Sequence, residues 1–180
     1  YGVNVYAHNL AAMLLQHAGV KSEYIPLAAW IAENPALNTM PISYSIRQPT
    51  GVNTLLGELM RDCNSVMYSD SEAAEIKLKY IELNQDTITL SDDEDIISGS
   101  VNITEKSETR INEVWMHFNQ RDAAKNITDS GNVRDIVISL DTDASSEDEY
   151  GDRRIKKIYS RYITNTTHAT DIASRTIKRY

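Results

Sequence analysis

The sequence has few of the residue types and patterns that indicate a particular class of functional site. Its single cysteine, Cys63, excludes an intrachain disulfide and a cysteine-rich zinc site. Only seven residues are glycine, and no glycine-rich phosphate loop or G-x-S-x-G motif occurs. No stretch approaches the run of about 20 apolar residues that a membrane-spanning helix needs. The net charge of −8 argues against a surface that follows a phosphate backbone, so we expect no nucleic-acid interface.

The rest of the composition is ordinary for a globular domain. Hydrophobic residues make up 41% of the chain and charged residues 24%, and its 180 residues suffice for a hydrophobic core. The chain begins at Tyr1 without a methionine, and it closes at Tyr180 within a helical pattern that no glycine or proline ends. We therefore expect a piece of a longer protein.

Apolar residues at helical spacing predict two helices near the start of the chain. The first should end at Gly19, which suits a left-handed C-terminal cap, and bury Tyr6, Leu10, Met13, Leu14 and Ala18. The second should run from Ser22 to Asn34, with Pro26 in its first turn, and bury Ile25, Ala28, Ala29 and Ala32.

Two further helices are predicted in the same way. One begins near Val52, with Thr50 or Asn53 as its cap, and buries Val52, Leu55, Leu56, Leu59 and Met60. The other follows the polar residues 164–167 and buries Ala169, Ile172, Ala173 and Ile177. The small alanines of this last helix predict close packing against a sheet.

Alternation of apolar and polar residues predicts the strands. We expect a half-buried strand from Met40 to Arg47, a hairpin of residues 65–69 and 75–83, and strands at 100–105, 111–119 and 133–140. The segment from Arg154 to Ile163 fits a helix or a strand, and we expect an edge strand before the last helix. The sequence thus predicts an α+β fold with mixed or antiparallel sheets and several packed amphipathic helices.

We expect this fold to be a fragment of a larger multidomain protein. Residues 1–64 form its mainly helical part, residues 65–163 form its β-rich part, and residues 164–180 form a helix that leads into a further domain.

One acidic loop carries the oxygen ligands of a calcium site. Asp141, Asp143, Ser145, Glu149 and Asp152 occupy positions one, three, five, nine and twelve of an EF-hand loop. However, a serine occupies position six, where the sharp turn needs glycine, and the closing residue is shorter than the usual glutamate. We expect a solvated loop that binds no metal, with a calcium site as the alternative.

No other group of residues predicts chemistry. The four histidines, His8, His17, His117 and His168, have no metal-ligand spacing such as H-E-x-x-H. The acidic residues 92–95 fit a favourable charge at the start of a helical turn. We therefore expect no enzyme activity, no catalytic residue, no bound metal and no cofactor.

The segment from Arg110 to Lys125 resembles part of a family of phage tail proteins. R-I-N-E-V-W-M-H-F is similar to the family's strand R-[IV]-x-x-V-W-V-x-[YF], and R-D-A-A-K to its loop R-[ND]-P-x-K, with Ala123 in place of proline. Residues 14–25 are similar to L-L-x-x-A-G-[VI]-x-x-x-[WY]-I, and residues 165–175 to N-x-x-x-A-x-x-I-A-x-R. The family comprises the baseplate-hub or tail-tip proteins of long-tailed bacteriophages and related gene transfer agents.

The resemblance implies a structural virion protein at the tail tip, assembled in the host cytoplasm. Such hubs close the tail tube and anchor the host-recognition fibre or spike. The resemblance also implies a ring of copies, commonly a trimer, and contacts with other tail proteins, but no catalytic residue. Tyr44, Trp115 and Tyr159 are candidates for these interfaces, although Trp115 equally fits the core. The alternatives are a carbohydrate- or calcium-dependent domain that adheres to a host surface, and a hydrolase fragment that no sequence feature supports.

Overall fold

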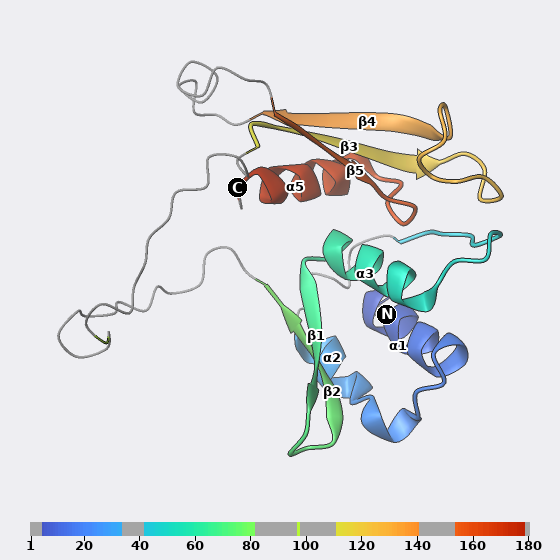
Figure 1. Ribbon diagram of the computed structural model, residues 1–180. Coiled ribbons are helices and arrows are strands. Elements are labelled where there is room, and N and C mark those ends of the chain that lie inside the picture. Colours follow the sequence, from blue (N-terminus) through green and yellow to red (C-terminus); the bar gives the residue numbers. More distant parts are fainter. Residues whose placement is uncertain (1–4, 34–41, 82–96, 98–110, 141–153, 179–180) are drawn as a thin grey trace.

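The computed structural model describes residues 5–33, 42–81, 97, 111–140 and 154–178, which form an α+β fold with two small sheets (Figure 1). One group of elements contains three α-helices and a hairpin, and the other contains a three-stranded sheet and the last helix. The predicted strand at 100–105, the acidic residues 92–95 and the loop 141–152 lie outside the described residues.

Helix α1 (Val5–His17) has the inward face that its spacing predicts. Tyr6, Leu10, Met13 and Leu14 are buried, whereas Ala18 lies past the end of the helix and is exposed, so its assignment to the core is wrong. Gly19 has a φ of 68°, the left-handed conformation that ends a helix without steric cost.

The predicted helix from Ser22 to Asn34 is wrong in its start and in most of its buried face, although Ile25 is buried as expected. A short 3-10 turn, η1 (Ser22–Tyr24), is followed by helix α2 (Leu27–Glu33). Proline disfavours the helical conformation in the residue before it, and Ile25, before Pro26, is extended at φ −113° and ψ 95°. Trp30 is buried and donates to the carbonyl of Ile76 over 2.9 Å. The remaining residues of the predicted inward face are exposed, namely Ala28, Ala29 and Ala32.

The predicted strand from Met40 to Arg47 is also wrong over its described part, residues 42–47. Ile42 forms one antiparallel bridge with Ile163, and the backbone N–H of Ser43 donates to the carbonyl of Tyr162. A strand needs a continuous partner, and this bridge is isolated. The segment instead packs through side chains, since the ring of Tyr44 meets that of Tyr162 edge-on at 5.1 Å.

Helix α3 (Val52–Asp62) buries Leu55, Leu56 and Leu59, as predicted, but its predicted cap is wrong. Gly51 is the N-cap residue and makes no side-chain cap hydrogen bond, while Thr50 donates to the carbonyl of Gln48. Strands β1 (Ser65–Asp70) and β2 (Glu75–Tyr80) then form the predicted antiparallel hairpin.

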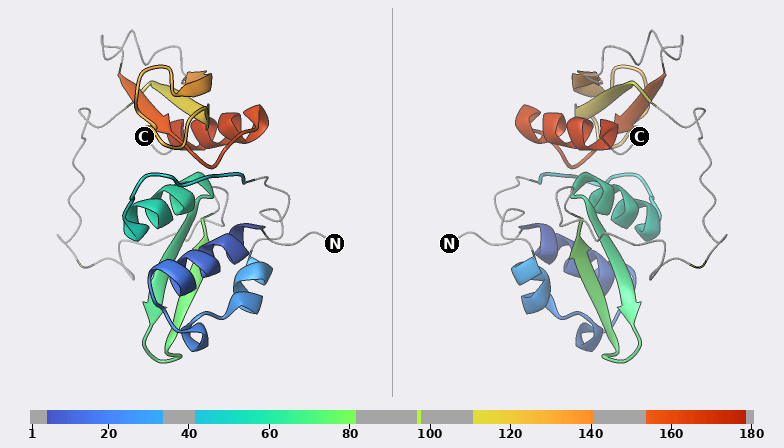
Figure 2. Two further views of the ribbon diagram at one scale, coloured as in Figure 1. Left: turned by 90° about the vertical axis from the view of Figure 1, so that its right-hand side faces the viewer. Right: turned by 90° about the vertical axis from the view of Figure 1, so that its left-hand side faces the viewer.

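The second sheet has the order β4-β3-β5. The central strand β3 (Glu113–Gln120) pairs antiparallel with β4 (Val133–Leu140) and parallel with β5 (Ile155–Tyr159). The segment 154–163 is therefore a strand over its first half, as expected. Helix α5 (Thr166–Ile177) buries Ala169, Ile172 and Ala173 and packs against β3 and β4. In both views of Figure 2, α5 lies on the side of the sheet that faces α3.

Candidate functional site

The side chains of the β4-β3-β5 sheet divide into two faces. Val114, Met116 and Phe118 are at most 1% exposed and point toward α5. The intervening residues of β3 point the other way, and the strand register places residues of both neighbouring strands beside them. We call this second side the open face, and it comprises Glu113, Trp115, His117, Ile136, Ile138, Leu140, Ile155, Lys157 and Tyr159.

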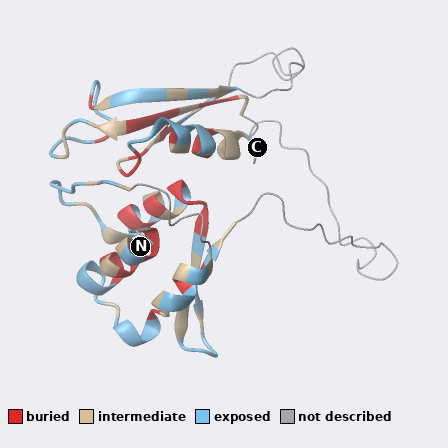
Figure 3. Ribbon diagram, turned by 180° about the vertical axis from the view of Figure 1, so that it is seen from behind, coloured by how far each residue is buried: buried red, intermediate tan, exposed pale blue. Residues whose placement is uncertain are grey.

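The open face exposes large apolar side chains along β4. Ile136, Ile138 and Leu140 are 52%, 53% and 61% exposed, and Ile155 on β5 is also exposed. Figure 3 shows most of β4 as exposed, beside the largely buried β3. Isolated exposed apolar side chains are common, but a contiguous row on one sheet face is typical of an interaction surface.

Two contacts fix the aromatic centre of the open face. The indole N–H of Trp115 donates to Oε1 of Glu113 over 2.7 Å, and Nζ of Lys157 lies 5.2 Å from the centre of the Trp115 ring. Beside them, the rings of His117 and Tyr159 stack with centroids 4.5 Å apart and planes 9° apart. Trp115 is thus held by a hydrogen bond and a cation–π contact, which lowers the entropy that a partner's binding would cost.

His117 adds no positive charge to this centre at neutral pH. Burial, and secondarily the nearby Lys157 ammonium, lower the pKa of the imidazole below its ordinary value of 6.5. Neither imidazole nitrogen has a hydrogen-bond partner in the described part of the chain. As a general base, His117 would need a nucleophile hydrogen-bonded to its imidazole, and the described residues provide none.

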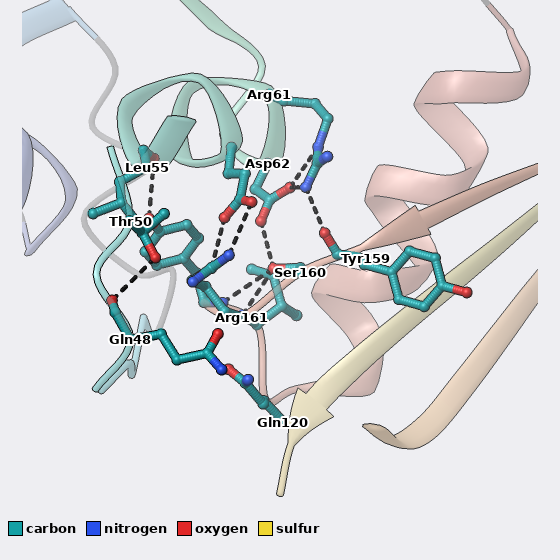
Figure 4. A network of polar contacts seen from close by, with 12 residues as sticks. Gln48, Thr50, Leu55, Arg61, Asp62, Gln120, Tyr159, Ser160 and Arg161 are labelled. Carbon is teal, nitrogen blue, oxygen red and sulfur yellow. Dashed lines mark hydrogen bonds and ion pairs between the residues drawn. The ribbon is translucent and has the colours of Figure 1, made fainter. Parts of the chain in front are cut away.

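A buried polar network joins α3 to the residues after β5 (Figure 4). The carboxylate of Asp62 is fully buried and accepts from Nη2 of Arg61 over 2.8 Å and from the hydroxyl of Ser160. Burial raises the pKa of Asp62, and the contacts with Arg61 and Ser160 oppose that rise. Because Asp62 has no exposed surface, its carboxylate is suited to hold the two groups of elements together and not to meet a ligand.

Two further contacts extend this network. The hydroxyl of Tyr162 donates to the carbonyl of Leu55 over 3.0 Å. The guanidinium of Arg161 donates to both carboxylate oxygens of Glu58, over 2.7 and 3.1 Å. Asp62 is not among the residues that we expected to be buried, although residues 55, 59 and 62 share one helix face and the first two are leucines.

The structure brings together two of the three predicted interface residues. Trp115 and Tyr159 both lie on the open face, whereas Tyr44 packs against Tyr162 elsewhere. The candidate calcium ligands Asp141, Asp143, Ser145, Glu149 and Asp152 lie outside the described residues. Among the residues that are described, no three histidine, cysteine, aspartate or glutamate side chains gather into a group that could hold a metal ion.

His8 and His17 are exposed on α1, far in the sequence from His168 on α5 and His117 on β3. The helices in the described ranges are too short or too polar to cross a membrane.

The motifs behind the phage resemblance fall largely on this half of the molecule. The R-I-N-E-V-W-M-H-F motif includes most of β3, the R-D-A-A-K motif forms the loop after it, and the motif at 165–175 lies in α5 and its cap. No protein-family model and no curated protein matches the sequence.

Proposed function

We propose that this chain is an assembly module of a virion, and that it forms part of the tail-tip or baseplate-hub protein of a long-tailed bacteriophage. In that role it helps to close the tail tube and to anchor the host-recognition fibre or spike. The observation that carries the assembly role is the open face, where a row of aliphatic side chains surrounds a fixed tryptophan.

The chemistry of the open face suits association with protein. Burying a whole isoleucine or leucine side chain stabilises by about 1.5–3 kcal/mol, so burying the half-exposed Ile136, Ile138 and Leu140 contributes about 1 kcal/mol each. Trp115 and Tyr159 are of the types that dominate binding energy at protein interfaces. The opposite face of the sheet is already covered by α5, so docking on the open face requires no rearrangement of the core.

The phage assignment rests on the resemblance of the motifs. It gains support from their location, because the motif with Val114 and Trp115 supplies one residue to the core and the next to the open face. When one face of a strand packs in the core and the other contacts a partner, the residue types that fit are restricted on both faces. In a hub, the open face would contact a neighbouring copy of this chain in the ring.

The experiment compares charged substitutions on the two sheets of the full-length gene product. Ile136→Lys with Ile138→Lys should abolish association in light scattering, because each places an ammonium group in the interface. Val66→Lys is the matched control, since Val66 is an exposed strand residue (42%) of the separate β1-β2 sheet. Melting temperatures of both variants should stay near that of the unmodified protein, since the substituted side chains are half exposed.

Two outcomes would contradict the proposal. If the unmodified full-length protein stays monomeric at high concentration and is absent from purified particles, neither the assembly role nor the hub assignment stands. If Val66→Lys disrupts association as much as the paired substitution, the open face is not the interface.

A further inference from the structure

A pocket of about 410 Å³ lies beside the polar network, separate from the open face. Its walls are residues 43–45 and 47, residues 119–123 at the end of β3 and the start of the loop after it, and residues 161 and 164 beyond β5. Figure 4 shows Gln120 and Arg161 at this junction, together with Gln48 from the segment before α3. Pockets of about 300–1,000 Å³ are the usual size for small-molecule ligands.

The pocket is basic in a chain whose net charge is −8. Three arginines, Arg47, Arg121 and Arg161, and one carboxylate, Asp122, line it, which leaves a lining charge of +2. Glu58 neutralises Arg161 from outside the lining and fixes its orientation. The guanidinium groups of Arg47 and Arg121 have no hydrogen-bond or ion-pair partner among the residues that the structure describes.

The walls that carry these two arginines are held in place. Asn132 is buried, and its side-chain amide accepts from the backbone N–H of Asp122 over 2.9 Å and donates to the carbonyls of Asp122 and Asn126. The side-chain amide of Gln48 donates to the carbonyl of Ala124 over 2.7 Å, which ties the segment of Arg47 to the loop of Arg121. The separation of the two walls is therefore set before any ligand arrives.

The remaining lining offers neutral polar groups and one aromatic ring. The hydroxyls of Ser43 and Ser45 have no partner in the described ranges, so they are available to ligand hydroxyls. Tyr44 stands between them in the sequence, half-buried, with its ring fixed against Tyr162. Guanidinium groups recognise carboxylate and phosphate through paired hydrogen bonds, and hydroxyl groups recognise sugars and other polar ligands.

We infer that this pocket binds a small polyhydroxylated ligand through one anionic group, a carboxylate or a phosphate, so that its ligand class is a sugar acid or a sugar phosphate. Arg47 and Arg121 bind the anionic group, and the serine hydroxyls bind ligand hydroxyls. The inference does not depend on the proposed assembly role, because the pocket and the open face share no residue.

Calorimetric titration at low ionic strength tests the pocket with glucuronate, glucose 6-phosphate, glucose and inorganic phosphate. We expect glucuronate or glucose 6-phosphate to bind at least about tenfold more tightly than glucose or inorganic phosphate, and which of the two binds identifies the anionic group. Added salt should weaken this binding, because exposed guanidinium groups contribute to it.

The variant Arg47→Gln with Arg121→Gln should raise the dissociation constant at least about tenfold. Both side chains are exposed and unpartnered in the described structure, so an unchanged melting temperature will show that the variant folds. Arg134→Gln is the matched control, since it removes an exposed arginine of β4 outside the pocket and should leave binding unchanged.

Three results would overturn the inference. The first is that neither glucuronate nor glucose 6-phosphate binds the unmodified protein. The second is that glucose or inorganic phosphate binds as tightly as these anionic sugars do. The third is that Arg134→Gln weakens binding as much as the paired variant does.

Discussion

At the residue scale, Asp62 occupies a demanding position, because a carboxylate there loses its contact with water. Its side chain is fully buried, with Arg61 and Ser160 as partners, and Arg61 is partly exposed to water. A buried carboxylate keeps its charge only if its partners compensate for the lost hydration. In Asp62 the effect of burial is larger than the opposing effect of Arg61 and Ser160, so the pKa of its carboxyl group lies above the ordinary value of 3.8.

This raised pKa gives a prediction for stability as a function of pH. The folded chain holds the Asp62 proton more tightly than the unfolded chain does, so the contribution of Asp62 to stability is fully present below pH 3.8. It is lost as the pH rises through the raised pKa. Asp62→Asn cannot ionise, so the free energy of unfolding of the unmodified protein should fall relative to that of the variant across this window.

Urea denaturation of both proteins between about pH 3.5 and about pH 7 measures this difference. Subtracting the variant removes the contribution of all other acidic groups that titrate in the same range. A difference that stays constant, or that grows in favour of the unmodified protein as the pH rises, would mean that Arg61 and Ser160 fully compensate for the burial of Asp62.

At the scale of single elements, α5 depends on its N-terminal cap. Oδ1 of Asn165 accepts from the backbone N–H of Thr167 over 2.8 Å, which satisfies one of the free donors of the first turn. Asn165→Ala should lower the free energy of unfolding by about 1 kcal/mol. Asn165→Asp is the control, because aspartate caps equally well and its charge favours the helix N-terminus.

Chemical denaturation followed by circular dichroism measures both variants. Equal losses in Asn165→Ala and Asn165→Asp would show that the amide of Asn165, and not its capping oxygen, is what matters.

The elements that the sequence predicted correctly are those whose pattern and local signals agree. α1 combines helical spacing with Gly19 in the left-handed conformation, and the hairpin and β3 combine alternation with polar turns. The errors occur where a local restriction or a missing partner overrides the pattern. Pro26 interrupts the second helix, and the segment 42–47 alternates like a strand but has only an isolated bridge.

The same limit applies to the open face. Alternation along β4 showed that Ile136, Ile138 and Leu140 share one side, but periodicity does not tell which side of a sheet a helix will cover. That choice depends on α5, which lies about thirty residues later in the chain. Trp115 and Tyr159 are interface candidates from the sequence because they are aromatic residues in a chain whose resemblance implies interfaces. Helical spacing places Asp62 on the face of Leu55 and Leu59, but its partner Ser160 lies 98 residues later in the chain, so periodicity alone does not predict their contact.

At the scale of the whole molecule, the residues after β5 are the joint between the two groups of elements. Ser160 donates to Asp62, the hydroxyl of Tyr162 donates to Leu55, and Arg161 pairs with Glu58, so three successive residues contact α3. Tyr162 and Ile163 are also almost fully buried. A joint that combines buried apolar area with satisfied polar contacts couples the stability of its two sides.

This coupling predicts that the described core unfolds in one cooperative transition. The two tryptophans of the chain report on different groups, since Trp30 lies in α2 and Trp115 lies in β3.

In Trp115→Phe, fluorescence follows only the helical group, and in Trp30→Phe it follows only the sheet. Each fluorescence midpoint in urea should coincide with the circular dichroism midpoint of the same variant, a comparison that any stability change from the substitution leaves intact. Adding Tyr162→Ala, which removes the buried ring and its hydrogen bond, should destabilise each variant by about 3–5 kcal/mol and separate its fluorescence midpoint from its own circular dichroism midpoint. A fluorescence midpoint that already differs from the circular dichroism midpoint of the same variant while Tyr162 is present would show that the network of Figure 4 does not couple the two groups.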